Sequence, residues 1–552
     1  MKWHILAKTK EQKAKLKNEE IIKILLQNRG LKTPKEIDNF LNPKKPEELS
    51  LKEVGIDSLE MKKAVKRIKQ AIEKKEKIIV YGDYDADGLS GTAILWEALH
   101  SLKAQVLPFI PRREDGYGLK VEKVKELAGE GISLIITVDQ GIVAHQQVEE
   151  ANKLGIDVII TDHHVLAEKK PKAIALIHTT KLAGCGVAWF LAQELVFAFK
   201  GEKNEKGLDL VTIGTIADMV PLLGPNRYLV KYGLKILQKT KRPGLLALYD
   251  FAGLKKEAID TFEVSYIIGP RLNAVGRMDD PMEALRLICT PNEAKAINLA
   301  QNINQKNEER KSLTEKMTIY ARGLWLKGDQ KESLIFIDHD SFHEGVTGLV
   351  AGKLMDEFYR PAIIIARGEK FSKGSARSIN EFNIIEAVRS CAAVLGPHGG
   401  HPRAAGFTIE TEKITLFKEK LTLLAEEQLK GQELSPTMRV DLELGLENLT
   451  FDFYKELVKF EPFGEGNPQP VFLTREIEVT DARVVGKEKQ HLSLKLRSLN
   501  GKIVFEGIGF NLGKFYSDLK PDEKIDLVYQ LFLDEWHDQK RLKLKLKDLK
   551  II

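Results

Sequence analysis

Cysteine is scarce in this chain of 552 residues, which contains only Cys185, Cys289 and Cys391. The three residues are odd in number and far apart, so a disulfide framework is not expected, and a reducing compartment such as the cytoplasm fits their use. No two of them have the short spacing of a zinc site. Cysteine usage therefore indicates neither a disulfide-linked protein nor a structural zinc protein.

Long apolar runs are also missing. No stretch of the sequence approaches the ~20 consecutive apolar residues that a helix needs to cross a bilayer. The first 20 residues carry too many charges to contain the apolar region of a signal peptide. We therefore expect a cytoplasmic protein with no membrane-spanning segment.

Length and charge are what the chain does contain. Charged residues make up 30% and hydrophobic residues 43% of the sequence, as in globular proteins, and 552 residues are too many for a single core. Residues 1–80 hold 21 Lys and Arg against 12 Asp and Glu, whereas the whole chain has a net charge of +6. A basic arm fits a polyanionic partner, although a solvated helix at residues 61–77 explains the same charges equally well.

The first half of the chain alternates apolar runs with helical patterns. Residues 1–45 have helical character, and residues from about 225 to 328 are helical again, ending in a polar stretch, Asn292–Trp325, typical of a connecting helix. Short apolar runs separated by helices are typical of buried parallel strands. We therefore expect a parallel α/β sheet built from Lys77–Tyr81, Gln105–Ile110, Leu134–Val138, Val158–Thr161 and Ala173–Ile177.

A second, smaller α/β segment begins at Leu334, repeats an apolar run at Ala362 and closes near Phe407–Ile409. From about residue 436, five or so short strands follow without helices between them, a pattern typical of a small β-barrel such as an OB-fold. The predicted fold class is therefore multidomain α/β: a parallel-sheet domain, a long helix, a smaller α/β domain and a C-terminal barrel. The predicted units are residues 1–47, 48–235, 236–328, 329–432 and 433–552.

Acidic side chains follow the first predicted strand directly. The strand Lys77–Tyr81 continues into Gly82-Asp83-Tyr84-Asp85-Ala86-Asp87-Gly88, with carboxylates at alternate positions. Carboxylates this close to one another at the end of a buried strand repel and lose hydration unless a cation lies between them. The glycines allow the backbone to turn tightly around such an ion. The pattern therefore predicts a divalent-metal site.

Two further strands end in the same way. Asp139 follows the third apolar run, Asp162-His163-His164 follows the fourth, and another acid, Asp218, lies in an otherwise apolar stretch. These groups are expected to converge because the carboxyl ends of parallel strands line one crevice. Asp and His ligands favour Mn²⁺ or Mg²⁺, and their number suits two ions ~3.5–4 Å apart that act on a phosphodiester. Each residue alone is more commonly a turn, helix-cap or structural residue, but their joint occurrence favours a metal site.

These motifs resemble the successive signatures of the DHH phosphoesterase superfamily: GDYDADG at Gly82–Gly88, VDQG at Val138–Gly141, TDHH at Thr161–His164 and ADMVPL at Ala217–Leu222. The resemblance implies phosphodiester hydrolysis by water activated on two divalent ions. It further implies metal ligands at Asp85, Asp87, Asp139, His163 and Asp218, with Asp139 as the bridge, Asp83 as a support or further ligand, His164 as a contact to the substrate phosphate and Asp162 as a residue that orients the site.

The second α/β segment contains two runs rich in Gly, His and Arg, Lys373–Ser378 and Gly396–Gly406. Exposed backbone N–H groups, a serine hydroxyl and an arginine fork fit an anion, and tight packing of a glycine-rich loop is the alternative. The sequence GGHPRAAG at Gly399–Gly406 is similar to the GGHxxAAG motif of DHHA1 domains, which cover DHH sites, and His343 matches that domain too. This resemblance implies contacts to phosphate or DNA by Ser375, Arg377 and His401.

Four segments resemble the RecJ family within this superfamily: Leu25–Pro43, Ile110–Leu119, Gly269–Arg277 and Phe463–Phe472. The resemblance implies DNA contacts by Arg271 and Arg277 and a contact to a 5′-phosphate by Arg112 or Arg113. The sequence does not decide between these two arginines, because it lacks one residue of the family's spacing. Independently, the alternation in Leu542–Lys547 predicts a strand with one basic face, which suits the phosphates of a single strand, although ordinary strand amphipathicity explains it equally well.

The resemblance implies an exonuclease that degrades single-stranded DNA from 5′ to 3′ into mononucleotides, in DNA repair and recombination, with two Mn²⁺ or Mg²⁺ ions. It also implies a monomer whose partners are single-stranded DNA, a single-strand-binding protein and a RecQ-type helicase. Two alternatives remain. A phosphodiesterase for short RNA oligonucleotides or cyclic dinucleotides would have no use for the extra terminal segments, and a non-catalytic single-strand-binding scaffold would have no evident use for the dense acids.

Overall fold

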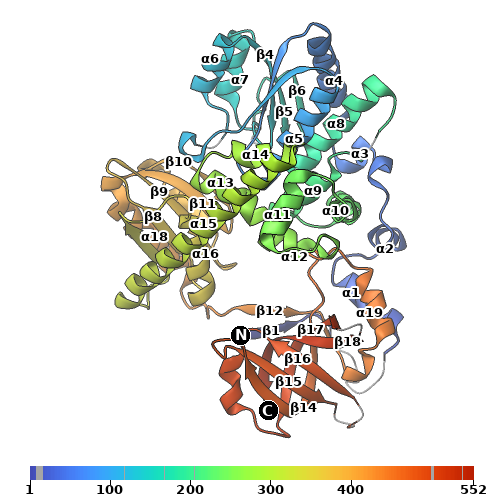
Figure 1. The fold of residues 1–552 in the computed structure, drawn as a ribbon. Helices are drawn as coiled ribbons and strands as arrows, with labels where there is room; N and C mark the ends of the chain where they lie inside the picture. Colours follow the sequence, from blue (N-terminus) through green and yellow to red (C-terminus); the bar gives the residue numbers. More distant parts are fainter. Residues whose placement is uncertain are drawn as a thin grey trace.

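The computed structural model describes residues 1–552 except 8–15, 117, 167, 204, 499–500, 502 and 537–538. Part of the predicted N-terminal helical region and Tyr117 of the run Ile110–Leu119 therefore lie outside the described residues. The chain forms two α/β domains and a C-terminal barrel, with a small two-stranded sheet beside the barrel (Figure 1). The predicted fold class is confirmed.

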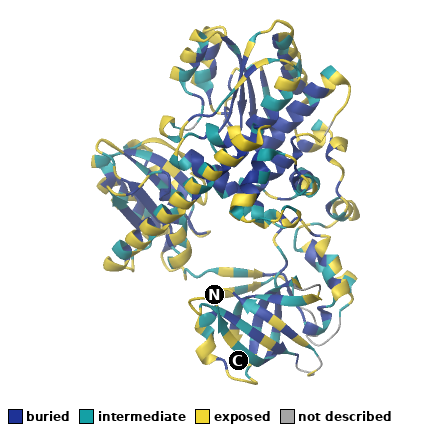
Figure 2. Ribbon diagram, viewed as in Figure 1, coloured by how far each residue is buried: buried dark blue, intermediate teal, exposed yellow. Residues whose placement is uncertain are grey.

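The first sheet is parallel throughout, with the strand order β3-β2-β4-β5-β6. Its strands are β2 (Lys77–Tyr81), β3 (Gln105–Phe109), β4 (Ile132–Val138), β5 (Asp157–Asp162) and β6 (Ala175–His178). Helices cover both faces, so the central strands are apolar on both sides and are buried (Figure 2). One face packs on α4 (Ser58–Glu73), α5 (Ala86–Ser101) and α8 (Gly184–Lys200), and the other on α6 (Val121–Gly129) and α7 (His145–Lys153).

One long helix, α15 (Glu293–Lys327), joins the two α/β domains. Its N-terminal part places Ala296 and Ile303 in the core of the first domain, and its C-terminal part places Met317 and Trp325 in the core of the second. The predicted connecting helix is thus confirmed, and it packs into both domains. The other helices between the parallel sheet and α15 are α9 (Leu208–Ala217), α10 (Gly224–Leu237), α11 (Pro243–Ala252), α12 (Thr261–Glu263), α13 (Gly269–Met278) and α14 (Met282–Cys289).

The second domain has a mixed sheet of order β10-β11-β9-β8-β7, in which only β7 and β8 are parallel. The run Gly399–Gly406 forms part of a hairpin of two strands and is not an irregular glycine-rich loop; its backbone groups pair across the sheet. The strands are β7 (Ile335–His339), β8 (Ala362–Ala366), β9 (Phe371–Arg377), β10 (Leu395–His401) and β11 (Ala404–Glu410), and the helices are α16 (Thr347–Phe358), α17 (Ile384–Ser390) and α18 (Ile414–Leu429).

The C-terminal barrel closes because β14 pairs with both β15 and β17, as predicted for an OB-like fold. In the predicted alternating strand, Leu544 and Leu546 are buried in the barrel core, which leaves the lysines for the other face. The barrel strands are β14 (Phe472–Val485), β15 (His491–Arg497), β16 (Val504–Gly509), β17 (Lys524–Trp536) and β18 (Gln539–Ile551), preceded by β13 (Leu442–Glu443) and α19 (Phe451–Val458).

The N-terminal segment belongs to the same body as the barrel. The prediction of helix throughout residues 1–45 is wrong at β1 (Lys2–Ile5), which pairs in parallel with β12 (Thr437–Val440). This strand has no nearby partner in the sequence, so no local pattern marks it. Two helices follow, α1 (Asn18–Gln27) and α2 (Pro34–Leu41). They add Ile21, Leu25, Leu26 and Phe40 to the barrel core.

Within the described residues, no helix has the length and apolar character needed to cross a membrane. The three cysteines are free thiols in this structure. Helix α3 (Leu51–Val54) is a single turn that leads into the first domain.

We expect Leu25→Ala to destabilise the barrel, although Leu25 precedes it by more than 400 residues. Loss of a buried leucine side chain typically costs about 2–5 kcal/mol, and Leu25 is fully buried in the barrel core. Hydrogen exchange of the amides of β14–β18 measures this cost as reduced protection. The matched control is Lys23→Ala, because Lys23 is exposed on the same helix. Loss of protection confined to α1 would contradict the assignment of both segments to one body.

Candidate metal centre

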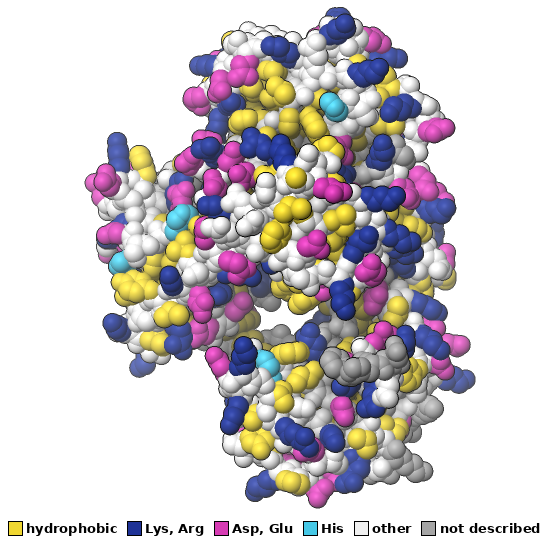
Figure 3. Space-filling model, in the orientation of Figure 1, with side chains coloured by type: hydrophobic (Ala, Val, Ile, Leu, Met, Phe, Trp, Pro, Cys, Tyr) yellow, Lys and Arg dark blue, Asp and Glu magenta, His cyan; other side chains and the backbone are white. Residues whose placement is uncertain are grey.

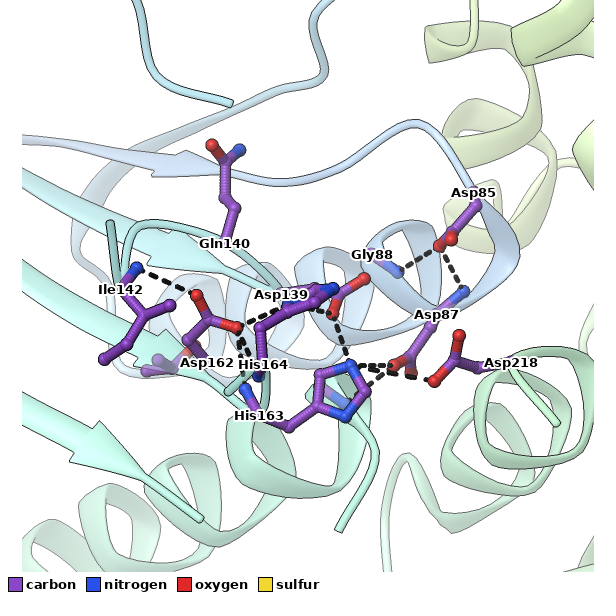
Figure 4. Close-up of polar contacts among 12 residues, drawn as sticks. Asp85, Asp87, Gly88, Asp139, Gln140, Ile142, Asp162, His163, His164 and Asp218 are labelled. Atoms are coloured by element: carbon purple, nitrogen blue, oxygen red, sulfur yellow. Dashed lines mark hydrogen bonds and ion pairs between the residues drawn. The ribbon is translucent and has the colours of Figure 1, made fainter. Parts of the chain in front are cut away.

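Three strand ends and one helix end bring the predicted ligands together (Figure 4). The acids of the first motif follow β2, Asp139 follows β4, the DHH triplet ends β5, and Asp218 follows α9. The side-chain atoms form three groups, within each of which the candidate ligand atoms lie within 4.8 Å of one another: Asp83, Asp85 and Asp139; Asp139, His163 and His164; and Asp87, His163 and Asp218. Because Asp139 and His163 each belong to two groups, the three groups form one continuous centre.

The His163 ring lies between carboxylates from three different elements. Its Nε2 atom is 3.1 Å from Asp139 Oδ1, 3.6 Å from Asp218 Oδ2 and 3.9 Å from Asp87 Oδ2. Burial lowers the pKa of His163, which favours the neutral imidazole with a lone pair available to a cation. The Nε2 atom therefore lies among the carboxylates, and the ring favours the neutral form that can offer a lone pair to a metal ion.

The carboxylates of the centre repel one another. Burial raises the pKa of Asp83, Asp85 and Asp139, and neighbouring aspartates raise it further. The same two influences, burial and then the charge of Asp87, raise the pKa of Asp218 to about 9. Such a cluster is stable in its charged form only with a cation among the oxygens.

The donor set also fits a divalent cation. Within the described structure, Asp83 Oδ1 is buried and accepts no hydrogen bond, so a cation would supply the contact that this oxygen lacks. Carboxylate oxygens combined with an imidazole nitrogen suit Mn²⁺ or Mg²⁺. The residues present therefore fit the two predicted ions.

Two helix N-termini orient the acids of the first motif. Asp85 caps α5, where its Oδ1 accepts hydrogen bonds from the backbone N–H groups of Asp87 and Gly88, both at 3.0 Å. Asp87 accepts from the backbone N–H groups of Gly184 at 2.7 Å and Cys185 at 2.9 Å, at the start of α8. Backbone N–H groups and the positive ends of helix dipoles partly offset the negative charge.

Asp139 adopts an unusual backbone conformation. Its φ of +61° lies in the left-handed region, which costs a non-glycine residue about 1–3 kcal/mol and is found mainly at functional sites. Gly184 allows the close approach of this carboxylate, because a Cβ atom at residue 184 would lie 2.5 Å from Asp139 Oδ1. The sequence analysis missed Gly184, whose signal was the glycine pair Gly184 and Gly186 opening an apolar helix.

Asp162 fixes the second histidine of the DHH triplet and the loop after β4. Its Oδ1 lies 2.8 Å from His164 Nδ1, and its Oδ2 accepts from the Ile142 backbone N–H at 2.9 Å. Burial lowers the pKa of His164, but the hydrogen bond and charge of Asp162 outweigh this effect and raise it to about 9. Asp162 therefore favours the protonated form of His164, the form that can donate to a phosphate oxygen.

Arginines from four segments gather beside the acidic centre. Arg113 lies over the Tyr84 ring at 4.6 Å and donates from Nε to the Gly276 carbonyl at 3.4 Å. Burial, together with the charges of Arg113, Arg310 and Arg377, lowers the pKa of Arg277 to about 10. Repulsion within this group favours a bound anion.

The predicted phosphate residues of the second domain lie at a helix N-terminus. Ser375 Oγ is 2.9 Å from Thr347 Oγ1. A Cβ atom at Gly348 would lie 3.0 Å from Arg377 Nη2 and 3.5 Å from Ser375 Oγ. Ser375 and Arg377 thus meet the start of α16, where backbone N–H groups favour anions. Thr347 and Gly348 were not predicted from the sequence, because they precede Ser375 by 28 and 27 residues.

Three predicted DNA-contact residues lie outside the metal-ligand groups. Arg112 is exposed and pairs with Glu114 at 3.4 Å. Arg271 is 8% exposed and donates to Asn304 Oδ1 and the Ile267 carbonyl. His401 is exposed on β10.

We expect Asp139→Asn to impair metal binding without destabilising the metal-free fold. At a Mn²⁺ concentration about 100 times its dissociation constant, the wild type gains roughly 2.7 kcal/mol in the free energy of unfolding. Asp139→Asn removes one repelling charge, so the metal-free variant unfolds at the same or a higher temperature but loses most of this gain. Thermal unfolding with Mn²⁺ and with chelator measures both effects. The control is the exposed Asp250→Asn, and a full Mn²⁺ response in Asp139→Asn would contradict a shared ligand.

The three domains match known protein families. Residues 77–215 match the DHH family, N-terminal domain; residues 331–427 match the DHHA1 domain; and residues 440–548 match the RecJ OB domain. The metal centre lies in the first of these regions, with Asp218 just beyond it, and the candidate phosphate residues Ser375 and Arg377 lie in the second.

Curated relatives are similar over nearly the whole chain. The single-stranded-DNA-specific exonuclease RecJ of Bacillus subtilis (strain 168) is 36% identical over 99% of this chain and 70% of the relative. RecJ of Escherichia coli (strain K12) is 31% identical over 96% of this chain and 95% of the relative. The crystal structure of Thermus thermophilus RecJ in complex with Mn²⁺ has a TM-score of 0.84 at 29% identity, and covers 100% of this chain and 79% of that one. The chain therefore belongs to the RecJ family of single-stranded-DNA-specific exonucleases.

Proposed function

We propose that this chain removes nucleotides from single-stranded DNA, starting at a 5′ end, by phosphodiester hydrolysis with two divalent ions, Mn²⁺ or Mg²⁺. The observation that carries the proposal is the set of three overlapping ligand groups around Asp139 and His163. One group alone would hold a single ion. Overlap at a shared carboxylate is what a pair of ions acting on one phosphodiester requires.

We assign the ligands by group. Asp83, Asp85 and Asp139 would hold one ion, and Asp87, Asp139, His163 and Asp218 the other, because Asp139 Oδ1 lies 3.1 Å from His163 Nε2. When bound, the ions supply a nucleophile at neutral pH and stabilise the charge that develops on the phosphate. Asp162 keeps His164 protonated and oriented, so its ring can donate to a phosphate oxygen.

We assign the terminal phosphate to the arginine group beside the centre. Arg377 and Ser375 meet the N-terminus of α16, and Arg113 contacts the motif that carries Asp83 and Asp85 through Tyr84. Between the two arginines left open by the sequence, these contacts favour Arg113, because Arg112 is exposed and paired with Glu114. A binding site for a 5′-phosphate beside the metal centre would hold the 5′ end of the DNA next to the ions, so that degradation runs from 5′ to 3′.

The remaining expectations belong to the same proposal. The family resemblance supports a role in DNA repair, a monomeric state, and a single-strand-binding protein and a RecQ-type helicase as partners. The patterns of the sequence support a cytoplasmic location and the domain limits given above. Closure of the C-terminal barrel, whose β18 carries the alternating lysines, supports a track for the rest of the strand.

End-labelled substrates test the direction of degradation. We expect 5′-labelled single-stranded DNA to release labelled mononucleotides at once, whereas 3′-labelled DNA gives a ladder of shortening products, because removal starts at the 5′ end. The reaction requires Mn²⁺ or Mg²⁺ and stops with chelator. RNA of the same sequence and short oligoribonucleotides serve as comparison substrates. Immediate release of a 3′ label, or faster hydrolysis of RNA, would overturn the assignment.

We expect Arg377→Ala to lower kcat/KM on 5′-phosphorylated single strands by at least about tenfold. A charge-assisted contact of this kind is typically worth ~1.5–3 kcal/mol. The loss is smaller on strands with a 5′-hydroxyl, because those strands lack the phosphate that Arg377 would contact. Both proteins on both substrates form a cycle that isolates this interaction. Arg389→Ala, at an exposed position on α17 and outside both glycine-rich runs, is the charge-matched control. An equal loss on the two substrates would show that Arg377 does not bind the terminal phosphate.

A further inference from the structure

The barrel body, which consists of the C-terminal barrel and the N-terminal segment packed on it, meets the first domain at the loop that follows Asp218. An opening lies between the barrel and the two α/β domains in one view (Figure 3). Residues 218–227 of the first domain nevertheless contact the barrel body. Leu222 is 2% exposed and belongs to the core of the first domain, whereas the next residue, Leu223, packs against the barrel core. Two adjacent side chains thus connect two different cores.

The barrel side of this junction is the run Phe463–Phe472. The Leu222 backbone N–H donates to the Glu465 carbonyl at 2.7 Å. The glycines at 464 and 466 allow this approach: added Cβ atoms would lie 2.6 Å from Leu222 and 3.0 Å from Pro221, respectively. The backbone of the barrel body therefore lies directly against the segment that leads away from Asp218.

Arg227, in the first turn of α10, closes the junction. Its side chain is fully buried and forms five hydrogen bonds, all to backbone carbonyls. Nε donates to Phe40 at 3.0 Å, and the other nitrogens donate to the carbonyls of residues 459–462 at 2.8–3.3 Å. The guanidinium also lies 3.9 Å from the centre of the Phe40 ring.

A buried guanidinium without a carboxylate partner needs a special reason. Among the described residues, no carboxylate forms an ion pair with Arg227. Five carbonyl dipoles and the Phe40 ring therefore make the direct contacts that compensate for lost hydration, while the charge of Glu461 acts at longer range. All five N–H groups of an arginine fork point in fixed directions. The arrangement therefore specifies where α2 and residues 459–462 lie relative to α10.

Asn467 repeats the same contacts from the barrel side. Its Nδ2 donates to the carbonyls of Phe460 and Pro462, both at 2.8 Å, and its Oδ1 accepts from Arg29 Nε at 2.7 Å. Arg227 and Asn467 thus share two acceptors. Because both side chains bind the same two carbonyls, they fix the position of residues 460–462 at the junction.

We propose that Arg227 is a positioning residue for the metal centre: it holds the barrel body against the Pro221–Leu222 segment and thereby fixes Asp218 opposite His163. The proposal rests on the function proposed above, in which Asp218 is a metal ligand. Asp218 ends α9, and Met219 follows it with a φ of +58° and an exposed side chain. The Met219 N–H donates to the Ile216 carbonyl at 3.2 Å and Val220 packs against the core of the first domain, and the contacts of the barrel body begin directly after them, at Pro221 and Leu222.

Mn²⁺ binding to the full-length protein, read from the electron paramagnetic resonance signal of free Mn²⁺, tests the proposal without nuclease activity. We expect Arg227→Met to weaken one of two Mn²⁺ sites about three- to tenfold. Asp218→Asn weakens the same site, and adding Arg227→Met to it gives little further loss. Arg227→Lys, which keeps the charge and some of the donors, restores part of the affinity and stands in if the Met variant does not fold.

Lys231→Met is the matched control, because it removes one positive charge one turn further along α10, where Lys231 makes a single contact to the Leu41 carbonyl at 3.2 Å. Its Mn²⁺ affinity stays within about twofold of the wild type. Unchanged Mn²⁺ binding in folded Arg227→Met would overturn the proposal, even if that variant is less stable. Absence of Mn²⁺ binding in the wild type would instead overturn the proposed function.

Discussion

Repulsion among buried carboxylates is the constraint on which the rest of this structure depends. Asp83, Asp85, Asp87, Asp139 and Asp218 share one small volume at the ends of strands and helices. In a flexible chain these charges would move apart, because at close range their repulsion energy exceeds the stabilisation that most single contacts provide. The fold prevents this with a parallel sheet buried on both faces and with two helix N-termini that hold Asp85 and Asp87.

The same constraint explains why acids and arginines are kept apart. Arg113, Arg277 and Arg377 lie close enough to repel one another, yet none forms an ion pair with the acidic centre in the described structure. Direct pairing would neutralise both groups and leave neither for a ligand. Separate acidic and basic clusters suit an anionic substrate, because the arginines can bind the anion while the acids hold the metal cations that act on it. The long helix α15, packed into both cores, maintains that separation.

Residues that act through local sequence were predictable, and residues that act through distant partners were not. The acids after β2, β4 and β5 follow apolar runs, so the topology of a parallel sheet implies their convergence. Strand β1 is different, because its only partner is β12 at the other end of the chain. Gly184 and Arg227 could not be predicted either, because the role of each depends on residues from other parts of the chain that lie against it. The contact between Arg113 and Tyr84, on which we base the proposal of Arg113 over Arg112, likewise joins segments that are distant in the sequence.

The chemistry of the junction suits its place beside the metal centre. Among the described residues Arg227 forms no ion pair, and its hydrogen bonds end on backbone carbonyls. These dipoles stabilise the guanidinium but do not cancel its positive charge. Because these acceptors belong to backbone, their positions follow from the fold of the barrel body and not from side-chain rotamers. An arginine held in this way aligns the two bodies through the fold itself, and it remains a cation in the segment that follows Asp218, whose pKa burial and Asp87 raise to about 9.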